Sequence, residues 1–131
     1  MLIAIQENSE VPLYQQIRDQ IVQGISDGRL QPGQRLPTVR ALAQQAGINA
    51  MTVNKAYQML KQQGYICTER RNGARVCTRF DGAPHLSQQN RELLARIISE
   101  AKVAGMGLEE FLQECRACFE QKPPQPPDHT P

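Results

Sequence analysis

Apolar residues recur at helical spacing in three segments of the first half of the chain. From Leu13 to Ile25 an apolar residue stands at every fourth position, which predicts a helix over residues 12–27. Shorter stripes of the same period predict helices over residues 38–46 and 50–63. A glycine follows each segment, as is usual just beyond the C-terminus of a helix. We therefore expect three helices in succession.

The apolar period changes to two residues after the third segment. Alternation around Ile66 predicts a strand, the dipeptide Asn72-Gly73 is a strong hairpin-turn signal, and the alternation resumes beyond it. A short apolar run at residues 2–5 predicts a further edge strand. The predicted fold is mostly α with a small β-ribbon, and residues 1–80 have the element order of a winged helix-turn-helix domain.

The second half of the chain predicts a small accessory element. Residues 81–86 read as a linker, apolar stripes predict helices over 87–104 and 108–121, and the proline-rich tail 122–131 is expected to be disordered. Two such helices bury little area alone, so we expect a two-helix extension that forms a dimer, with packing onto its own chain as the alternative. The candidate dimerisation residues are Leu93, Leu94, Ile97, Ile98, Leu108, Phe111, Leu112, Cys115 and Phe119.

The net charge of +2 on 131 residues is unevenly distributed. Residues 1–80 hold ten basic and five acidic side chains, whereas residues 81–131 hold five and eight. This asymmetry favours a polyanionic partner for the first half only, with ordinary surface charge as the alternative. The sequence shows neither a membrane-spanning apolar run nor a signal peptide at its start, which predicts a cytoplasmic protein without a membrane partner.

The short turn predicted between the second and third helices is typical of a helix-turn-helix, whose second helix enters a major groove. On the third helix, Met51, Asn54, Lys55 and Gln58 fall opposite the apolar stripe. Amides can pair with adenine edges and lysine with guanine or phosphate, so this face is a candidate for base contacts. A plain solvated face is the alternative.

Two further features favour nucleic acid. Asn49 and Thr52 stand at the start of the third helix, where free N–H groups suit a phosphate. Arg70, Arg71 and Arg75 surround the hairpin turn, which suits a phosphate backbone or a minor groove. A charged edge that prevents aggregation is the alternative interpretation of these arginines.

The four cysteines include one CxxC motif, at Cys115 and Cys118. No second CxxC accompanies it, and the two histidines stand in poor contexts, so we expect no metal and no cofactor. Cys115 also falls on an apolar stripe, where a free cysteine behaves as a small hydrophobe. No nucleophile–base pair or phosphate loop stands out, so we do not expect an enzyme.

Three stretches of the chain resemble one bacterial family. Residues 12–17 (PLYQQI), 28–40 (GRLQPGQRLPTVR) and 52–57 (TVNKAY) are similar, in order and spacing, to the GntR family of transcription regulators, and the likeness covers about residues 10–78. The short remainder resembles the YtrA subfamily, whose small helical extension serves dimerisation. The resemblance implies a winged helix-turn-helix that binds DNA.

Family contacts carry over only where this sequence matches. The resemblance implies a DNA contact at Arg40, contacts at the start of the recognition helix, and a wing tip at Asn72 and Gly73. The family often has arginine where Ala50 and Asn54 stand, so an arginine–guanine contact does not transfer. The combined DNA-binding set is Arg35, Thr38, Arg40, Asn49, Ala50, Met51, Thr52, Asn54, Lys55, Gln58, Arg70, Arg71, Asn72, Gly73 and Arg75.

The sequence thus predicts a homodimeric transcription regulator, acting as a repressor on a palindromic operator in double-stranded DNA. One alternative is a thiol- or metal-responsive regulator that senses through Cys115 and Cys118. The other is a protein-interaction adaptor that does not bind DNA. The sequence does not indicate a small-molecule effector.

Overall fold

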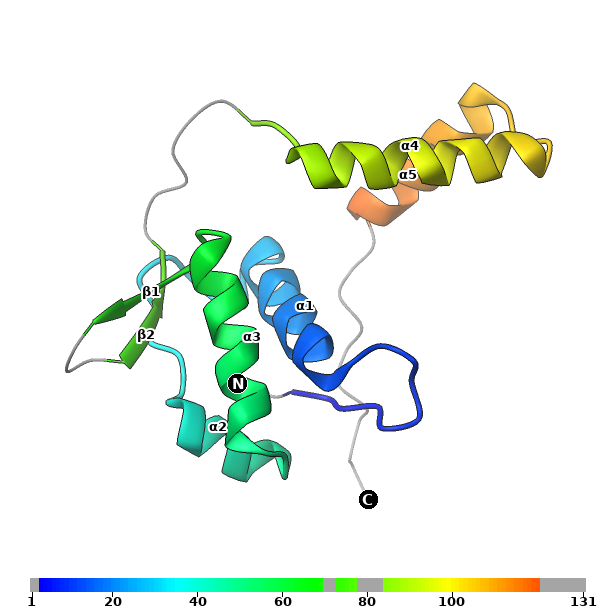
Figure 1. The fold of residues 1–131 in the computed structure, drawn as a ribbon. Helices are drawn as coiled ribbons and strands as arrows, with labels where there is room; N and C mark the ends of the chain where they lie inside the picture. Colours follow the sequence, from blue (N-terminus) through cyan, green and yellow to red (C-terminus); the bar gives the residue numbers. More distant parts are fainter. Residues whose placement is uncertain (1–2, 70–72, 78–83, 121–131) are drawn as a thin grey trace, which may run out of the picture. The chain divides into compact units, whose positions relative to one another are not determined.

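The computed structural model describes residues 3–69, 73–77 and 84–120 (Figure 1). The chain divides into two compact units, Met1–Phe80 and Asp81–Pro131. The predicted fold class is confirmed, and every helix begins and ends within one residue of its predicted bounds. The elements are α1 (Leu13–Ser26), α2 (Val39–Ala46), α3 (Ala50–Gln62), β1 (Ile66–Glu69), β2 (Gly73–Val76), α4 (Gln88–Val103) and α5 (Leu108–Glu120).

Helix α3 is the centre of the first unit, since it packs against α1, α2 and β1 (Figure 1). The apolar stripe of α1 is buried at Ile17 and Ile21, and the stripe of α3 is buried at Val53 and Leu60. Burial of such side chains stabilises the unit by roughly 1.5–3 kcal/mol each. The core therefore fixes the orientation of α3 from the side opposite its polar face.

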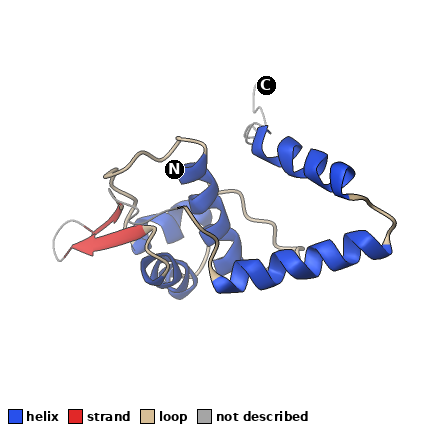
Figure 2. Cartoon of the chain, turned by 90° about the horizontal axis from the view of Figure 1, so that it is seen from above, coloured by secondary structure: helices blue, strands red, loops and turns tan. Residues whose placement is uncertain are grey.

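The two strands form an antiparallel ribbon at the edge of the first unit (Figure 2). Ile66 pairs with Val76, and both side chains are buried against the helices. The connector before α2 lies along the other edge of β2: Leu36 N donates to Ala74 O at 2.8 Å, and Val76 N donates to the Gln34 carbonyl at 2.9 Å. The sequence did not predict this backbone pairing, which joins the connector to the ribbon.

The edge strand predicted over residues 2–5 is wrong for its described residues, which pair with no strand. Glutamine side chains of α1 take the place of a strand partner. Ala4 N donates to Gln20 Oε1 at 2.8 Å, and Gln20 Nε2 donates to Ala4 O at 2.6 Å. Gln16 makes the same pair of bonds with the backbone of Gln6. A side-chain amide has both a donor and an acceptor, so it can satisfy a backbone group as a strand would.

The second unit is a pair of helices joined by a tight turn. Gly105 has a φ of +89°, and Met106 N donates to Ala101 O at 3.0 Å, which closes α4. No residue of α4 or α5 is buried. The predicted tail 122–131 and part of the predicted linker, 81–83, lie outside the described residues. None of the described helices is long and apolar enough to cross a membrane.

Candidate nucleic-acid interface

The turn between α2 and α3 has only three residues. Gly47 adopts a left-handed φ of +69° that glycine tolerates without strain, and Ile48 packs against the core. Asn49 then caps α3, since its Oδ1 accepts a hydrogen bond from Met51 N at 2.8 Å. Because the turn is short and capped, the first turn of α3 projects from a fixed point.

Helix α3 has one buried and one exposed face. Val53, Ala56, Tyr57 and Leu60 are buried, as the sequence predicts. Met51 is 78% exposed, so an apolar side chain stands in solvent at the start of the helix. Such a side chain can contact a thymine methyl group, and the amides beside it can pair with base edges. The exposed residues of α3 are Ala50, Met51, Asn54, Lys55, Gln58, Lys61 and Gln62.

The side chain of Lys55 is exposed, but a contact with Tyr14 restrains its position. Its Nζ lies 4.0 Å from the ring centroid of Tyr14 on α1, in a cation–π arrangement. Such a contact is worth about 0.5–1 kcal/mol at an exposed site. The ammonium is therefore held on the α1 side of α3, and it sits beside the other exposed side chains of that face rather than at their centre.

The residues on and just before α2 that are predicted to contact DNA are exposed. Thr38 Oγ1 accepts a hydrogen bond from Ala41 N at 3.0 Å, so Thr38 caps α2. Arg40 lies in the first turn of α2 with its side chain in solvent. Arg35 is also exposed, and its backbone bridges to Arg75 of β2. Thr38 has a structural role that does not depend on DNA, whereas Arg35 and Arg40 present cations.

The wing is described in part. Arg70, Arg71 and Asn72 lie outside the described residues. Gly73 begins β2 with a φ of +68°, which fits its predicted place at the turn. Arg75 is half-buried on β2, and its Nη1 donates to Gly33 O at 3.3 Å. The guanidinium of Arg75 therefore contacts the connector. The sequence had placed this cation at the hairpin turn as a DNA contact and did not predict a contact within the protein.

One contact that the sequence did not reveal orients α2 against α3. The hydroxyl of Tyr57 donates to the Pro37 carbonyl at 2.7 Å. The sequence stripe treats Tyr57 as an apolar residue, and nothing in its spacing indicates a partner for its hydroxyl. Burial raises the pKa of Tyr57 well above its usual value near 10. The bond fixes the residue just before the cap of α2.

The Tyr57→Phe variant should be less stable by about 1–2 kcal/mol at neutral pH, since Pro37 loses its donor. In the wild type the unfolded tyrosine ionises near pH 10 while the folded one stays neutral, so stability is lost as pH rises above 10. Tyr57→Phe should show less of this alkaline loss in urea titrations at pH 7 and pH 10.5. Tyr14→Phe serves as the control that keeps it. Equal alkaline losses in all three proteins would contradict the assignment.

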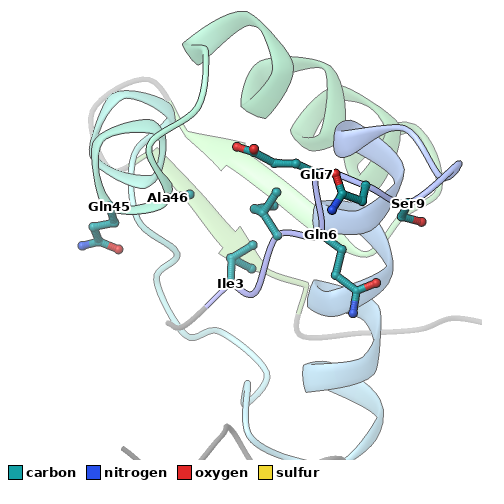
Figure 3. A pocket seen from close by; sticks show the side chains of 8 residues that line it. Ile3, Gln6, Glu7, Ser9, Gln45 and Ala46 are labelled. Carbon is teal, nitrogen blue, oxygen red and sulfur yellow. The ribbon is translucent and has the colours of Figure 1, made fainter.

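A hollow of about 820 Å³ lies beside the end of α2. Figure 3 shows that the N-terminal segment, with Ile3, Gln6 and Ser9, forms one side, while Gln45 and Ala46 of α2 form the other. Among the described residues that line it, Glu7 is the one charged side chain. None of the candidate DNA-binding residues lines this hollow, which is therefore separate from the candidate DNA surface.

The CxxC cysteines lie on α5. Cys115 is half-buried and Cys118 is exposed. Within residues 3–69, 73–77 and 84–120, no group of three or more histidine, cysteine or acidic side chains could hold a metal ion. The structure therefore shows Cys115 as part of the apolar stripe and gives the motif no further ligand.

A capped recognition helix with an exposed polar face, a supporting helix and a β-ribbon define a winged helix-turn-helix, a class of DNA-binding domain. A model of the gntR family of bacterial regulatory proteins matches residues 13–76. The chain is 34% identical over 124 residues to the HTH-type transcriptional repressor YtrA of Bacillus subtilis, covering 88% of this chain and 93% of YtrA. The chain belongs to the GntR family, and its likeness to YtrA includes the C-terminal extension.

Two other similarities bear on the first unit. The HTH-type transcriptional regulator Rv1152 of Mycobacterium tuberculosis is 46% identical over 70 residues, which is 53% of this chain and 57% of Rv1152. The chain thus corresponds to little more than half of that relative. The solved structure of AraR(DBD) in complex with operator ORX1 is 29% identical with a TM-score of 0.52, covering 59% of this chain and 96% of AraR(DBD). Rv1152 and YtrA are named as a transcriptional regulator and a transcriptional repressor, in agreement with the prediction of a non-enzymatic, DNA-binding protein.

Proposed function

We propose that this protein is a homodimeric transcriptional repressor that acts in the cytoplasm on a palindromic DNA operator. The observation that carries the proposal is the exposed face of α3, where Met51, Asn54 and Gln58 lie opposite a buried stripe. A helix fixed from behind and capped at its start can hold its side chains in a major groove without further ordering.

Each element of the first unit then has a role on DNA. The first turn of α3, from Asn49 to Asn54, meets base edges, with Met51 suited to thymine methyl groups. Arg35 and Arg40 meet phosphates, and the arginines at 70 and 71 extend that contact from the wing. Arg75 holds the connector in place by donating a hydrogen bond to the Gly33 carbonyl. The likeness to AraR(DBD), which was solved in complex with an operator, supports DNA binding by the first unit.

The second unit supplies the dimer. Leu93, Leu94, Ile97 and Leu112 keep 37–46% of their surface exposed although they lie on the apolar stripes. Ile98, Phe111 and Cys115 are half-buried, whereas Leu108 and Phe119 are 71% and 93% exposed. Apolar stripes left this open on two short helices are stabilised by burial against a second copy. The repressor YtrA, similar over both units, supports a repressing role.

Selection of bound oligonucleotides with the purified full-length protein tests the proposal. The selected sites should be inverted repeats whose half-sites are centred about 10–10.5 base pairs apart, or a multiple of that. Affinity should fall steeply with salt, since several phosphates are neutralised. A single unrepeated half-site would contradict the dimer. Salt-independent or absent DNA binding would favour the adaptor that the sequence left open.

A further inference from the structure

Two cysteines that the CxxC motif does not include meet at the base of the wing. Cys67 of β1 and Cys77, just after β2, have their Sγ atoms 2.7 Å apart. A disulfide bond is about 2.05 Å long, so the two thiols are within about 0.7 Å of bonding distance. Both are free cysteines. This is the one place in the described residues where two thiols are brought into contact.

The ribbon holds the two thiols in this position. In the register of the sheet, Cys67 pairs with Arg75, and Cys77 N donates to Tyr65 O at 3.0 Å. Cys77 lies two residues beyond Arg75, the partner of Cys67, so the two sulfurs meet diagonally across the ribbon. They lie on the face of the ribbon opposite Ile66 and Val76, whose side chains are buried in the core. The sulfurs are thus already in contact in the existing register of the ribbon.

The two thiols differ in their access to solvent. Cys67 is exposed, whereas Cys77 keeps only 8% of its surface. Burial, together with the neighbouring Cys67 thiol, raises the pKa of Cys77 to about 11. An oxidant in solution therefore reaches Cys67 first. Cys77 is shielded from the oxidant and stays mostly protonated at neutral pH, and what favours its reaction with oxidised Cys67 is the 2.7 Å separation of the two sulfurs.

We propose that Cys67 and Cys77 form a reversible redox-modification site, which a peroxide closes into a disulfide across the base of the wing. The Cys67 thiol reacts with hydrogen peroxide to give the sulfenic acid and one water molecule. The Cys77 sulfur attacks the Cys67 sulfur, its proton leaves with the hydroxyl as a second water, and the S–S bond forms. A cellular dithiol reverses the change by thiol–disulfide exchange and is itself oxidised. In a reducing compartment the bond is therefore transient.

The disulfide encloses residues 68–76, which include the arginines of the wing. It should raise the melting temperature of the first unit by at least about 5 °C, because it restricts the unfolded chain. It should also tighten operator binding by about two- to tenfold, because a covalent link between the ends of β1 and β2 restricts the ribbon before DNA binds. This last consequence rests on the proposed function, whereas formation of the bond does not.

Tryptic mapping of the full chain after treatment with peroxide tests the bond. Cleavage after lysine and arginine places the four cysteines on separate peptides, 62–70, 76–79, 103–116 and 117–131. The expected product is peptide 62–70 linked to 76–79, lost again on treatment with dithiothreitol. Failure of that product to form, or linkage only between 103–116 and 117–131, would overturn the proposal.

Matched variants complete the test. Cys67→Ser changes an exposed side chain and should remove both the linked peptide and the rise in melting temperature. Cys118→Ser, also exposed, should keep both. If the bond forms and operator affinity is equal in both redox states, the effect on DNA binding is wrong and the modification site stands. If neither redox state binds any selected DNA, the proposed function fails, and the linked peptide still decides the modification site.

Discussion

Replacement of Arg40 and Asn54 by alanine together is expected to weaken operator binding by about two to three orders of magnitude. Asn54 lies on the exposed face of α3, where a bidentate amide–base pair is worth about 1–3 kcal/mol. Arg40 lies exposed in the first turn of α2, where it can neutralise a phosphate. Fluorescence anisotropy with a selected operator, at one fixed salt concentration, measures the loss.

The two single variants should behave differently. Asn54→Ala should reduce discrimination at one base pair of the half-site, whereas Arg40→Ala should weaken binding to all sequences and lower the salt dependence by about one unit of slope. Arg91→Ala removes the same charge from α4, and Gln62→Ala removes an amide from the far end of α3. Both should bind normally. Unchanged binding by the double variant, with the melting temperature preserved, would rule out this surface.

The pattern of apolar residues was sufficient to predict the five helices and the hairpin because each depends on local spacing. The stripe from Leu13 to Ile25, the glycine at the turn and the caps at Thr38 and Asn49 act within a few residues of their own positions. The buried face of α3 follows from the same period, so the opposite, exposed face could be predicted as well.

Contacts between distant residues could not be predicted in this way. The glutamines of α1 that bind the N-terminal segment are ordinary polar residues on an amphipathic helix, and only the fold brings Gln20 to Ala4. The same holds for Lys55 over the ring of Tyr14 and for the guanidinium of Arg75 at Gly33. These contacts change the candidate site, because they restrain two of the predicted cations.

The contact between two of the four cysteines could not be predicted from the sequence either. The CxxC motif draws attention to Cys115 and Cys118 because two cysteines only three positions apart are visible in the sequence. The sulfurs that meet are those of residues 67 and 77, which are ten positions apart. Their approach depends on the register of β1 and β2, and the turn signal alone does not give that register.

Replacement of Leu93 and Ile97 by glutamate should convert the protein to a monomer. Both lie on the stripe of α4, at 44% exposure each, four residues apart and thus on one side of the helix. Burial of two carboxylates in an apolar interface without partners costs several kcal/mol. If the wild-type protein is the proposed dimer, light scattering should give about half of its mass for the variant, and far-UV circular dichroism should show that the helices of the first unit are retained.

Loss of the dimer should weaken operator binding by at least about 100-fold, because the second half-site is no longer bound within the same complex. Binding of a single half-site should change little, since the winged unit keeps its own core. Val103→Glu adds a carboxylate to the same helix at a 90% exposed position outside the stripe, and it should remain dimeric. A double variant that stays dimeric would remove this face of α4 from the interface. A monomer that keeps full operator affinity would show instead that the first unit alone recognises the site, which would contradict the paired mode of binding.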